Sequence, residues 1–106
     1  MTDRGWMEQE VKRASYRAVL RGDIVEEQAG AAFGMCREAF VREKEAHGLL
    51  TASLYRYGQF LFLYAEGVGK TPVPEELCAS LAPFLQRWPE TVEKPGKDRL
   101  WLRMQP

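Results

Sequence analysis

Hydrophobic side chains recur along the chain in two periods, one typical of strands and one typical of helices. In residues 12–21 apolar and polar positions alternate, which predicts a half-buried strand. The same alternation returns in residues 49–57 and 59–66, which are separated by Gly58 and rich in aromatic and branched side chains, and it predicts a β-hairpin. Residues 98–104 alternate once more, so a final strand is predicted there.

A first helix is predicted between the first strand and the hairpin. Asp23 and Glu26 have the spacing of a capping box, which marks a helix start. The apolar stripe that follows at helical spacing consists of Val25, Ala29, Ala32, Phe33, Cys36 and Phe40. Gly48 is the expected end of this helix. Gly30 and Gly34 predict close packing of the helix on a sheet.

A second helix is predicted after the hairpin. It follows a loop that contains Gly67, Gly69 and Pro72, and it carries one apolar face. That face consists of Leu77, Leu81, Phe84, Leu85 and Trp88. Pro83 lies inside this segment, and a proline there removes a backbone hydrogen bond and bends the helix.

The predicted order of elements is β-α-β-β-α-β, which defines the fold class. We expect an α+β protein of the ferredoxin-like type, with a four-stranded antiparallel sheet and two helices on one face. A length of 106 residues fits one hydrophobic core. Residues 1–11 are predicted to form an N-terminal arm, and residues 12–106 a single domain.

The alternation also sorts the predicted strands into two faces. One face is aliphatic and suits the helices; it includes Tyr16, Leu50, Leu54, Leu100, Leu102 and Met104. The other face is aromatic and charged, which is the composition of an interface, and a second copy of the chain is its expected cover. Such a homodimer also leaves room for a ligand. The predicted ligand-binding residues are Arg17, Tyr55, Tyr64, Glu66, Trp101 and Arg103. The alternative is that these charges pair across strands and only support the interface.

Composition and charge narrow the choice of partners and compartment. Fifteen basic and fifteen acidic residues cancel, so nucleic acid and anionic membranes are not expected partners. The N-terminal residues contain no apolar run that predicts a secretion signal or a membrane span. Cys36 and Cys78 lack the close spacing of a zinc knuckle or a redox pair, and are predicted to be small buried thiols. A cytoplasmic location is expected.

Motifs for catalysis or cofactors are not found. The segment from Gly67 to Thr71 resembles the end of a phosphate-binding loop, but Tyr64 stands where that motif requires its first glycine. His47 is the single histidine, so a histidine metal cluster is excluded, and a helix-capping role is expected for it. No catalytic residue, metal ligand or cofactor site is therefore assigned.

The hairpin from Leu54 to Glu66, preceded by a helix ending in His47 and Gly48, resembles the L-rhamnose mutarotase family and, more broadly, the dimeric α/β-barrel proteins. The resemblance covers residues 13–104 and includes Trp88 late in the second helix. It implies a dimeric barrel and a pocket for a small polar molecule. That family carries a tyrosine and a histidine on its first helix for cofactor-free proton transfer, and residues 28–33 contain neither.

The expected function follows from the sheet face. We expect a homodimer that binds a small polar or anionic molecule on this face. One alternative is a cofactor-independent isomerase of the mutarotase type, in which Tyr55 or Glu66 has a displaced pKa. The other is a protein-interaction module without a pocket, in which the aromatic side chains pack flat against a partner.

Overall fold

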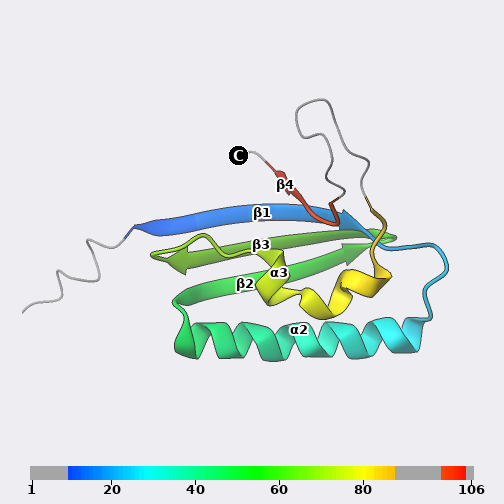
Figure 1. Ribbon diagram of the computed structural model, residues 1–106, viewed down its shortest axis with the longest axis horizontal. Helices are drawn as coiled ribbons and strands as arrows, with labels where there is room; N and C mark the ends of the chain where they lie inside the picture. Colours follow the sequence, from blue (N-terminus) through cyan, green and yellow to red (C-terminus); the bar gives the residue numbers. More distant parts are fainter. Residues whose placement is uncertain (1–9, 88–98, 105–106) are drawn as a thin grey trace, which may run out of the picture.

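A computed structural model describes residues 10–87 and 99–104 of the chain. Its elements, in order, are strand β1 (Val11–Val19), helix α2 (Glu26–Ala46), strands β2 (Leu49–Tyr57) and β3 (Phe60–Val68), helix α3 (Pro74–Leu77), the 3-10 helix η1 (Ala79–Phe84) and strand β4 (Leu102–Met104), as Figure 1 shows. Within this part of the chain the strands form one antiparallel sheet in the order β2-β3-β1-β4. The predicted α+β fold class with the ferredoxin-like order is confirmed.

The central strands β1 and β3 pair along their whole lengths, from Val11 opposite Val68 to Val19 opposite Phe60. Gly58 opens the two-residue turn between β2 and β3 with a φ of 61°. A positive φ at this position gives the turn the twist that an antiparallel hairpin needs. The predicted hairpin is therefore confirmed, and β1 lies against its second strand.

Strand β2 begins with an irregularity that shifts its alternation. Leu49 pairs with Gly67, but Thr51 pairs with Glu66, so Leu50 is an extra residue in the ladder. Leu49 is consequently buried in the core, whereas Leu50 remains 47% exposed. The prediction of Leu50 on the aliphatic face is wrong by one residue, because alternation alone does not reveal a bulge.

Helix α2 starts without the predicted capping box. Its N-cap is Val25, which offers no side-chain hydrogen bond. Asp23 instead accepts two hydrogen bonds from Arg21, at 2.8 and 3.1 Å. The buried stripe of the helix is Ala29, Ala32, Cys36 and Ala39, and Val25 is half exposed. Gly30 and Gly34 lie on the outer side, where an added Cβ would meet nothing within 4 Å, so close packing through them is also wrong.

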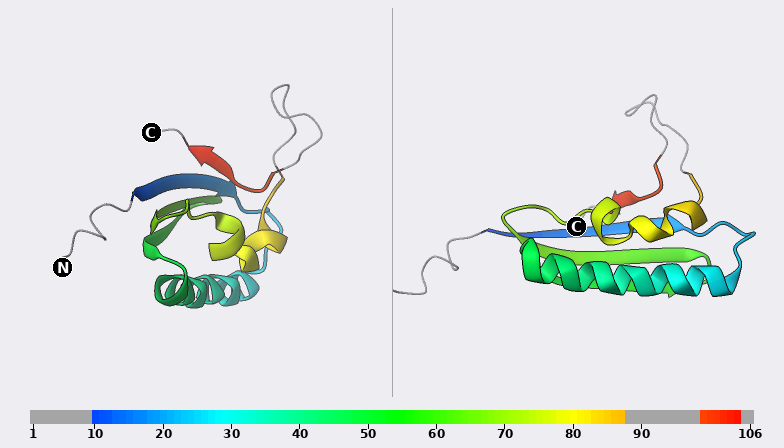
Figure 2. Two further views of the ribbon diagram at one scale, coloured as in Figure 1. Left: turned by 60° about the vertical axis from the view of Figure 1, so that its left-hand side comes forward. Right: turned by 60° about the horizontal axis from the view of Figure 1, so that its bottom comes forward.

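The predicted second helix is present as two short pieces. Helix α3 has four residues, Cys78 breaks it, and η1 continues as six residues of 3-10 helix that include Pro83. Leu77 and Leu81 are buried as expected. Figure 2 shows α2 and the α3–η1 segment on the same side of the sheet. Trp88, which was predicted to share this face, lies outside the described residues.

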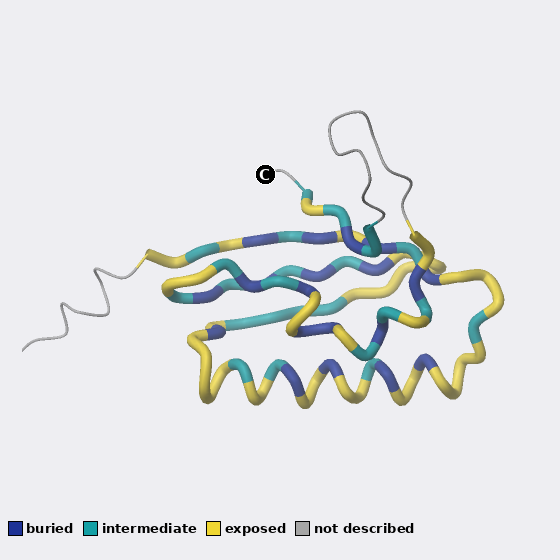
Figure 3. The backbone as a smooth tube through the Cα atoms, in the orientation of Figure 1, coloured by how far each residue is buried: buried dark blue, intermediate teal, exposed yellow. Residues whose placement is uncertain are grey.

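Buried side chains alternate with less buried ones along β1 and β3, as the dark blue stretches in Figure 3 show. The buried set lies between the sheet and the helices. It includes Ala14, Tyr16, Ala18, Leu20, Leu61, Leu63 and Ala65 from the strands, with Cys36, Leu77, Cys78 and Leu81 from the helical segments. One core therefore covers one face of the sheet, and no helix of the described residues covers the opposite face.

The orientation of β4 is the opposite of the predicted one. It pairs with β1 so that Arg103 lies opposite Tyr16 and Leu102 lies opposite Arg17. Directly opposed residues point to the same side of an antiparallel pair, so Arg103 is on the helix side. Trp101 is 7% exposed and belongs to the core. In residues 101–104 either alternation directs an apolar side chain inward, Trp101 in one case and Leu102 with Met104 in the other, and the pairing with β1 selects the one that was not predicted.

Candidate functional site

The face of the sheet that points away from the helices is called here the open face. Figure 2 shows no helix of the described chain on this side. The strand register assigns to it Arg13, Ser15, Arg17, Val19, Thr51, Ser53, Tyr55, Tyr57, Phe60, Phe62, Tyr64, Glu66, Leu102 and Met104. Tyr55 is 62% exposed and Tyr57 80% exposed, so large aromatic surface is in contact with water.

The open face is divided into a polar half and an aromatic half along the strand direction. The polar half consists of Arg13, Ser15, Thr51, Ser53, Tyr64 and Glu66. The aromatic half consists of Val19, Tyr55, Tyr57, Phe60 and Phe62, at the hairpin end. Arg17 lies at the boundary, opposite Phe62 and one row from Tyr64. Leu102 and Met104 extend the apolar surface across β1.

A hydrogen-bonded group occupies the polar half. The Tyr64 hydroxyl donates to Oε2 of Glu66, and Nε of Arg13 donates to the same oxygen at 3.3 Å. The Glu66 carboxylate raises the pKa of the Tyr64 phenol, because the hydrogen bond favours the protonated form. Tyr64 therefore stays protonated near neutral pH, and its hydroxyl donates to Glu66. These contacts suit binding and positioning better than the abstraction of a proton.

The charges of the open face leave it positive. Arg13 and Arg17 carry two positive charges and Glu66 carries one negative charge, so these described residues sum to +1. Arg13 has 65% of its side chain exposed even in its ion pair with Glu66. Exposed guanidinium groups bind carboxylates and phosphates through paired hydrogen bonds. A polar molecule with a negative group is therefore the ligand type that this charge distribution favours.

Four of the six predicted ligand-binding residues share the open face: Arg17, Tyr55, Tyr64 and Glu66. The other two, Trp101 and Arg103, do not, because β4 has the reversed orientation described above. Arg13 was missed as a site residue. The sequence contained the information, because Arg13 and Arg17 are four residues apart in the first strand and such residues point to the same face.

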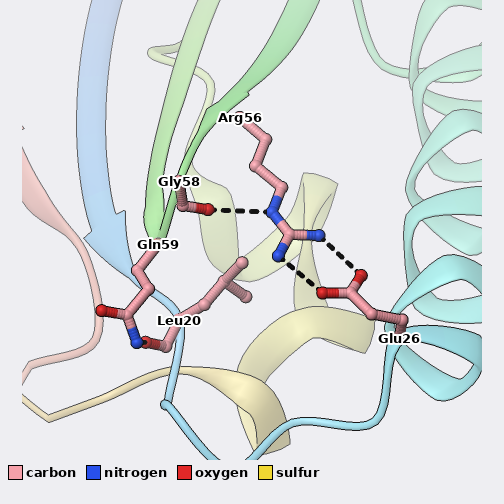
Figure 4. A network of polar contacts seen from close by, with 5 residues as sticks. All are labelled: Leu20, Glu26, Arg56, Gly58 and Gln59. Carbon is pink, nitrogen blue, oxygen red and sulfur yellow. Dashed lines mark hydrogen bonds and ion pairs between the residues drawn. The ribbon is translucent and has the colours of Figure 1, made fainter.

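A second polar group fixes the hairpin to the start of α2, as Figure 4 shows. The two terminal nitrogens of Arg56 donate to the two carboxylate oxygens of Glu26, both at 2.9 Å. Nε of Arg56 donates to the carbonyl oxygen of Gly58 at 3.0 Å. Arg56 lowers the pKa of Glu26 through this bidentate bond. The guanidinium of Arg56 thus joins the start of α2 to the β2–β3 turn. These bonds hold in place the hairpin end that carries Tyr57 and Phe60.

His47 takes part in the end of α2. Its backbone N–H bonds to the carbonyl oxygen of Glu43, and its Nδ1 lies 2.9 Å from Oε2 of the same residue. In the described ranges, no three histidine, cysteine or acidic side chains are grouped closely enough to hold a metal ion. No helix among the described residues is long and apolar enough to cross a membrane.

Comparison of the chain with protein-family models, with curated proteins and with solved structures finds no match.

Proposed function

We propose that the protein acts through the open face: two copies pair across their aromatic halves and bind a small polar or anionic molecule between their polar halves. The observation that carries this proposal is the exposure of the aromatic half beside two arginines on a sheet whose other face carries the core.

Pairing is favoured by the cost of leaving the aromatic half in water. Burial of a large aromatic side chain stabilises a complex through the hydrophobic effect, and such side chains dominate interface energies. A second copy supplies the same surface, and a twofold axis makes such a surface self-complementary. Leu102 and Met104 of β4 add to the area that a partner would cover.

Ligand binding is favoured by the separation of the two halves. When a partner covers the aromatic half, the adjoining polar half loses part of its contact with water. Hydrogen bonds and ion pairs become stronger in such an environment, and groups without a partner become costly. Arg13, Arg17 and the hydroxyl groups of Ser15 and Ser53 then offer donors to a small anionic or hydroxylated molecule.

A mutarotase-type reaction is the less favoured alternative. It requires groups that exchange protons, and α2 places Ala29 and Ala32 in the core where that chemistry would need reactive side chains. On the open face, the raised pKa of Tyr64 opposes its use as a base. We therefore propose binding without assigning a reaction.

Native mass spectrometry of protein purified directly from cells tests the proposal. We expect a dimer that retains a reproducible additional mass. In Arg17→Ala the additional mass is lost and the dimer persists, because the substitution removes one donor group from the boundary of the two halves. Arg37→Ala is the matched control, since Arg37 is an exposed arginine on α2, and it should behave as the wild type.

Three other outcomes are informative. A monomer would reject pairing through the open face. A dimer with no retained mass would favour the protein-interaction module without a pocket. A retained mass that survives Arg17→Ala would place the ligand somewhere other than at this boundary.

A further inference from the structure

The polar half of the open face carries donors on one strand and an acceptor on the next. Arg13, Ser15 and Arg17 occupy successive open-face positions of β1, about 6.8 Å apart along the strand. Glu66 lies opposite Arg13 on β3, and Tyr64 lies opposite Ser15. A ligand that covers this half therefore meets guanidinium groups along β1 and one carboxylate on β3.

We infer that the ligand of the open face is a monocarboxylate that carries hydroxyl groups: its carboxylate binds at Arg17 and Ser15, and one of its hydroxyl groups donates to Glu66. This inference rests on the proposed function, because it names the class of the molecule that the polar halves bind.

Glu66 is the acceptor for a hydroxyl group of the ligand. Tyr64 and Nε of Arg13 both donate to its Oε2, the latter at 3.3 Å. Each oxygen of a carboxylate has two lone pairs, so Oε1 can accept from a ligand without breaking either bond. The Glu66 side chain is 26% exposed, which leaves it accessible to a molecule on the open face. A ligand that brings a donor is therefore favoured over one that brings only acceptors.

The arginines of β1 bind the negative group of the ligand. Arg17 is exposed and lies two positions from Ser15, whose hydroxyl adds a further donor. Arg13 stands on the other side of Ser15, and its side chain is 65% exposed although its Nε is paired with Glu66. Guanidinium and hydroxyl donors together match the two oxygens of a carboxylate.

The charge of the polar half selects a single negative charge on the ligand. Arg13 and Arg17 with Glu66 sum to +1, which one carboxylate neutralises. A neutral polyol would leave an arginine uncompensated once a partner copy covers the site. A phosphate monoester carries close to two negative charges at neutral pH, and Glu66 would repel the second one. A carboxylate without hydroxyl groups would leave Oε1 of Glu66 without a donor, which is costly in a covered site.

Four linear probes of equal chain length test the class: gluconate, hexanoate, sorbitol and sorbitol 6-phosphate. Gluconate has a carboxylate and hydroxyl groups, hexanoate only the carboxylate, sorbitol only the hydroxyl groups, and sorbitol 6-phosphate a dianion in place of the carboxylate. Isothermal titration calorimetry of the dialysed full chain at neutral pH measures the four affinities. Gluconate should bind at least about ten-fold more tightly than each of the other three, because only gluconate satisfies both the arginines and Glu66.

Two variants separate the roles of the charged residues. Arg17→Ala should weaken gluconate binding at least about ten-fold, because it removes a charged donor to the carboxylate. Glu66→Gln should weaken gluconate and strengthen sorbitol 6-phosphate, because the amide lacks the charge that favours a hydroxyl donor and repels a dianion. A purely structural role of Glu66 would change both affinities in the same direction.

The matched control is Arg37→Ala, which removes an exposed arginine of α2 and should leave all four affinities unchanged. Circular dichroism checks that each variant folds, and the comparison of the four probes on the wild type stands without the variants.

Failure of the ligand class and failure of the proposed function give different results. The class is overturned if gluconate binds no more tightly than the other three probes, or if Arg17→Ala leaves its affinity unchanged. The proposed function then stands if the wild type is a dimer and another probe, or a molecule retained from cells, is lost in Arg17→Ala. A monomer in native mass spectrometry that binds none of the probes overturns both.

Discussion

Among single residues, Tyr16 makes the most informative polar contact in the core. It is 6% exposed, and its hydroxyl donates to the carbonyl oxygen of Pro72 at 2.8 Å. Pro72 belongs to the loop between β3 and α3 and is buried itself. The bond therefore attaches that loop to the central strand β1. Burial raises the pKa of the Tyr16 phenol.

Tyr16→Phe should reduce the free energy of unfolding by about 1–2 kcal/mol, because it leaves the carbonyl of Pro72 without its buried partner. Urea denaturation at neutral pH measures the change. Tyr57→Phe is the matched control, since Tyr57 is 80% exposed in the single chain and should leave the midpoint unchanged at a protein concentration at which the chain is monomeric. Equal midpoints for Tyr16→Phe and the wild type would show that the buried bond adds no net stability.

The same residue gives a pH dependence. The folded state holds the Tyr16 proton more tightly than the unfolded state does, so its contribution is complete below the ordinary tyrosine pKa of about 10. It is lost as the pH rises through the higher folded pKa. Tyr16→Phe should therefore lose less stability than the wild type between neutral and strongly alkaline pH.

The alternation of side chains along a strand explains which site residues could be predicted from the sequence. Arg17, Tyr55, Tyr64 and Glu66 lie in long strands, where alternation fixes the side to which each residue points. Trp101 was misplaced because it precedes a strand of three residues, in which pairing with β1 decides the orientation.

At the scale of elements, the joint between α2 and β2 depends on Gly48. Its φ of 80° lies in the left-handed region, and a Cβ at this position would be 2.9 Å from the carbonyl oxygen of Val68. The carbonyl oxygen of Gly48 also accepts a hydrogen bond from Val68 N–H at 2.9 Å. The turn is thus held against the end of β3, which fixes where the hairpin begins.

Gly48→Ala should destabilise the fold by about 2 kcal/mol, since it adds backbone strain and a clash with Val68. Gly30→Ala is the paired variant. Gly30 lies inside α2 with nothing near an added Cβ, so alanine should stabilise the fold by about 0.5–1 kcal/mol. Thermal unfolding should move the two midpoints in opposite directions, and a shift in the same direction would contradict this account.

Long periodic elements were predictable, and short or irregular ones were not. The three long strands and α2 carry enough alternating or helical positions to define themselves. The second helix was expected as one segment bent at Pro83, but it breaks at Cys78 and continues as a 3-10 helix that contains Pro83. The capping box failed because Arg21 binds the side chain of Asp23, which a spacing rule does not include.

At the scale of the whole molecule, the two faces of the sheet have different uses. One is covered by α2 and the α3–η1 segment, and the other shows its aromatic half to solvent. Tyr55 on the open face and Met35 on the outer side of α2 have similar exposures, 62% and 58%. Replacement of either residue by aspartate should therefore cost the single chain little stability. A difference between the two variants then reports the loss of a partner at the open face.

Tyr55→Asp should convert the proposed dimer into a monomer, because a carboxylate buried in the interface without a partner is costly. Wild-type thermal unfolding should shift to higher temperature with protein concentration, as dissociation and unfolding are coupled. In Tyr55→Asp this concentration dependence should vanish, and in Met35→Asp it should persist. Light scattering gives the masses, and a dimeric Tyr55→Asp would exclude the open face as the contact.

The irregular start of β2 has a consequence for misassembly. Among the described strands, β2 pairs only with β3, so its outer edge carries backbone donors and acceptors that could recruit a strand from another molecule. The extra residue at Leu50 interrupts the regular spacing of that edge and increases its local twist. A second strand cannot then extend the ladder evenly past this point. We therefore expect the bulge to disfavour the addition of a further strand at this end of β2.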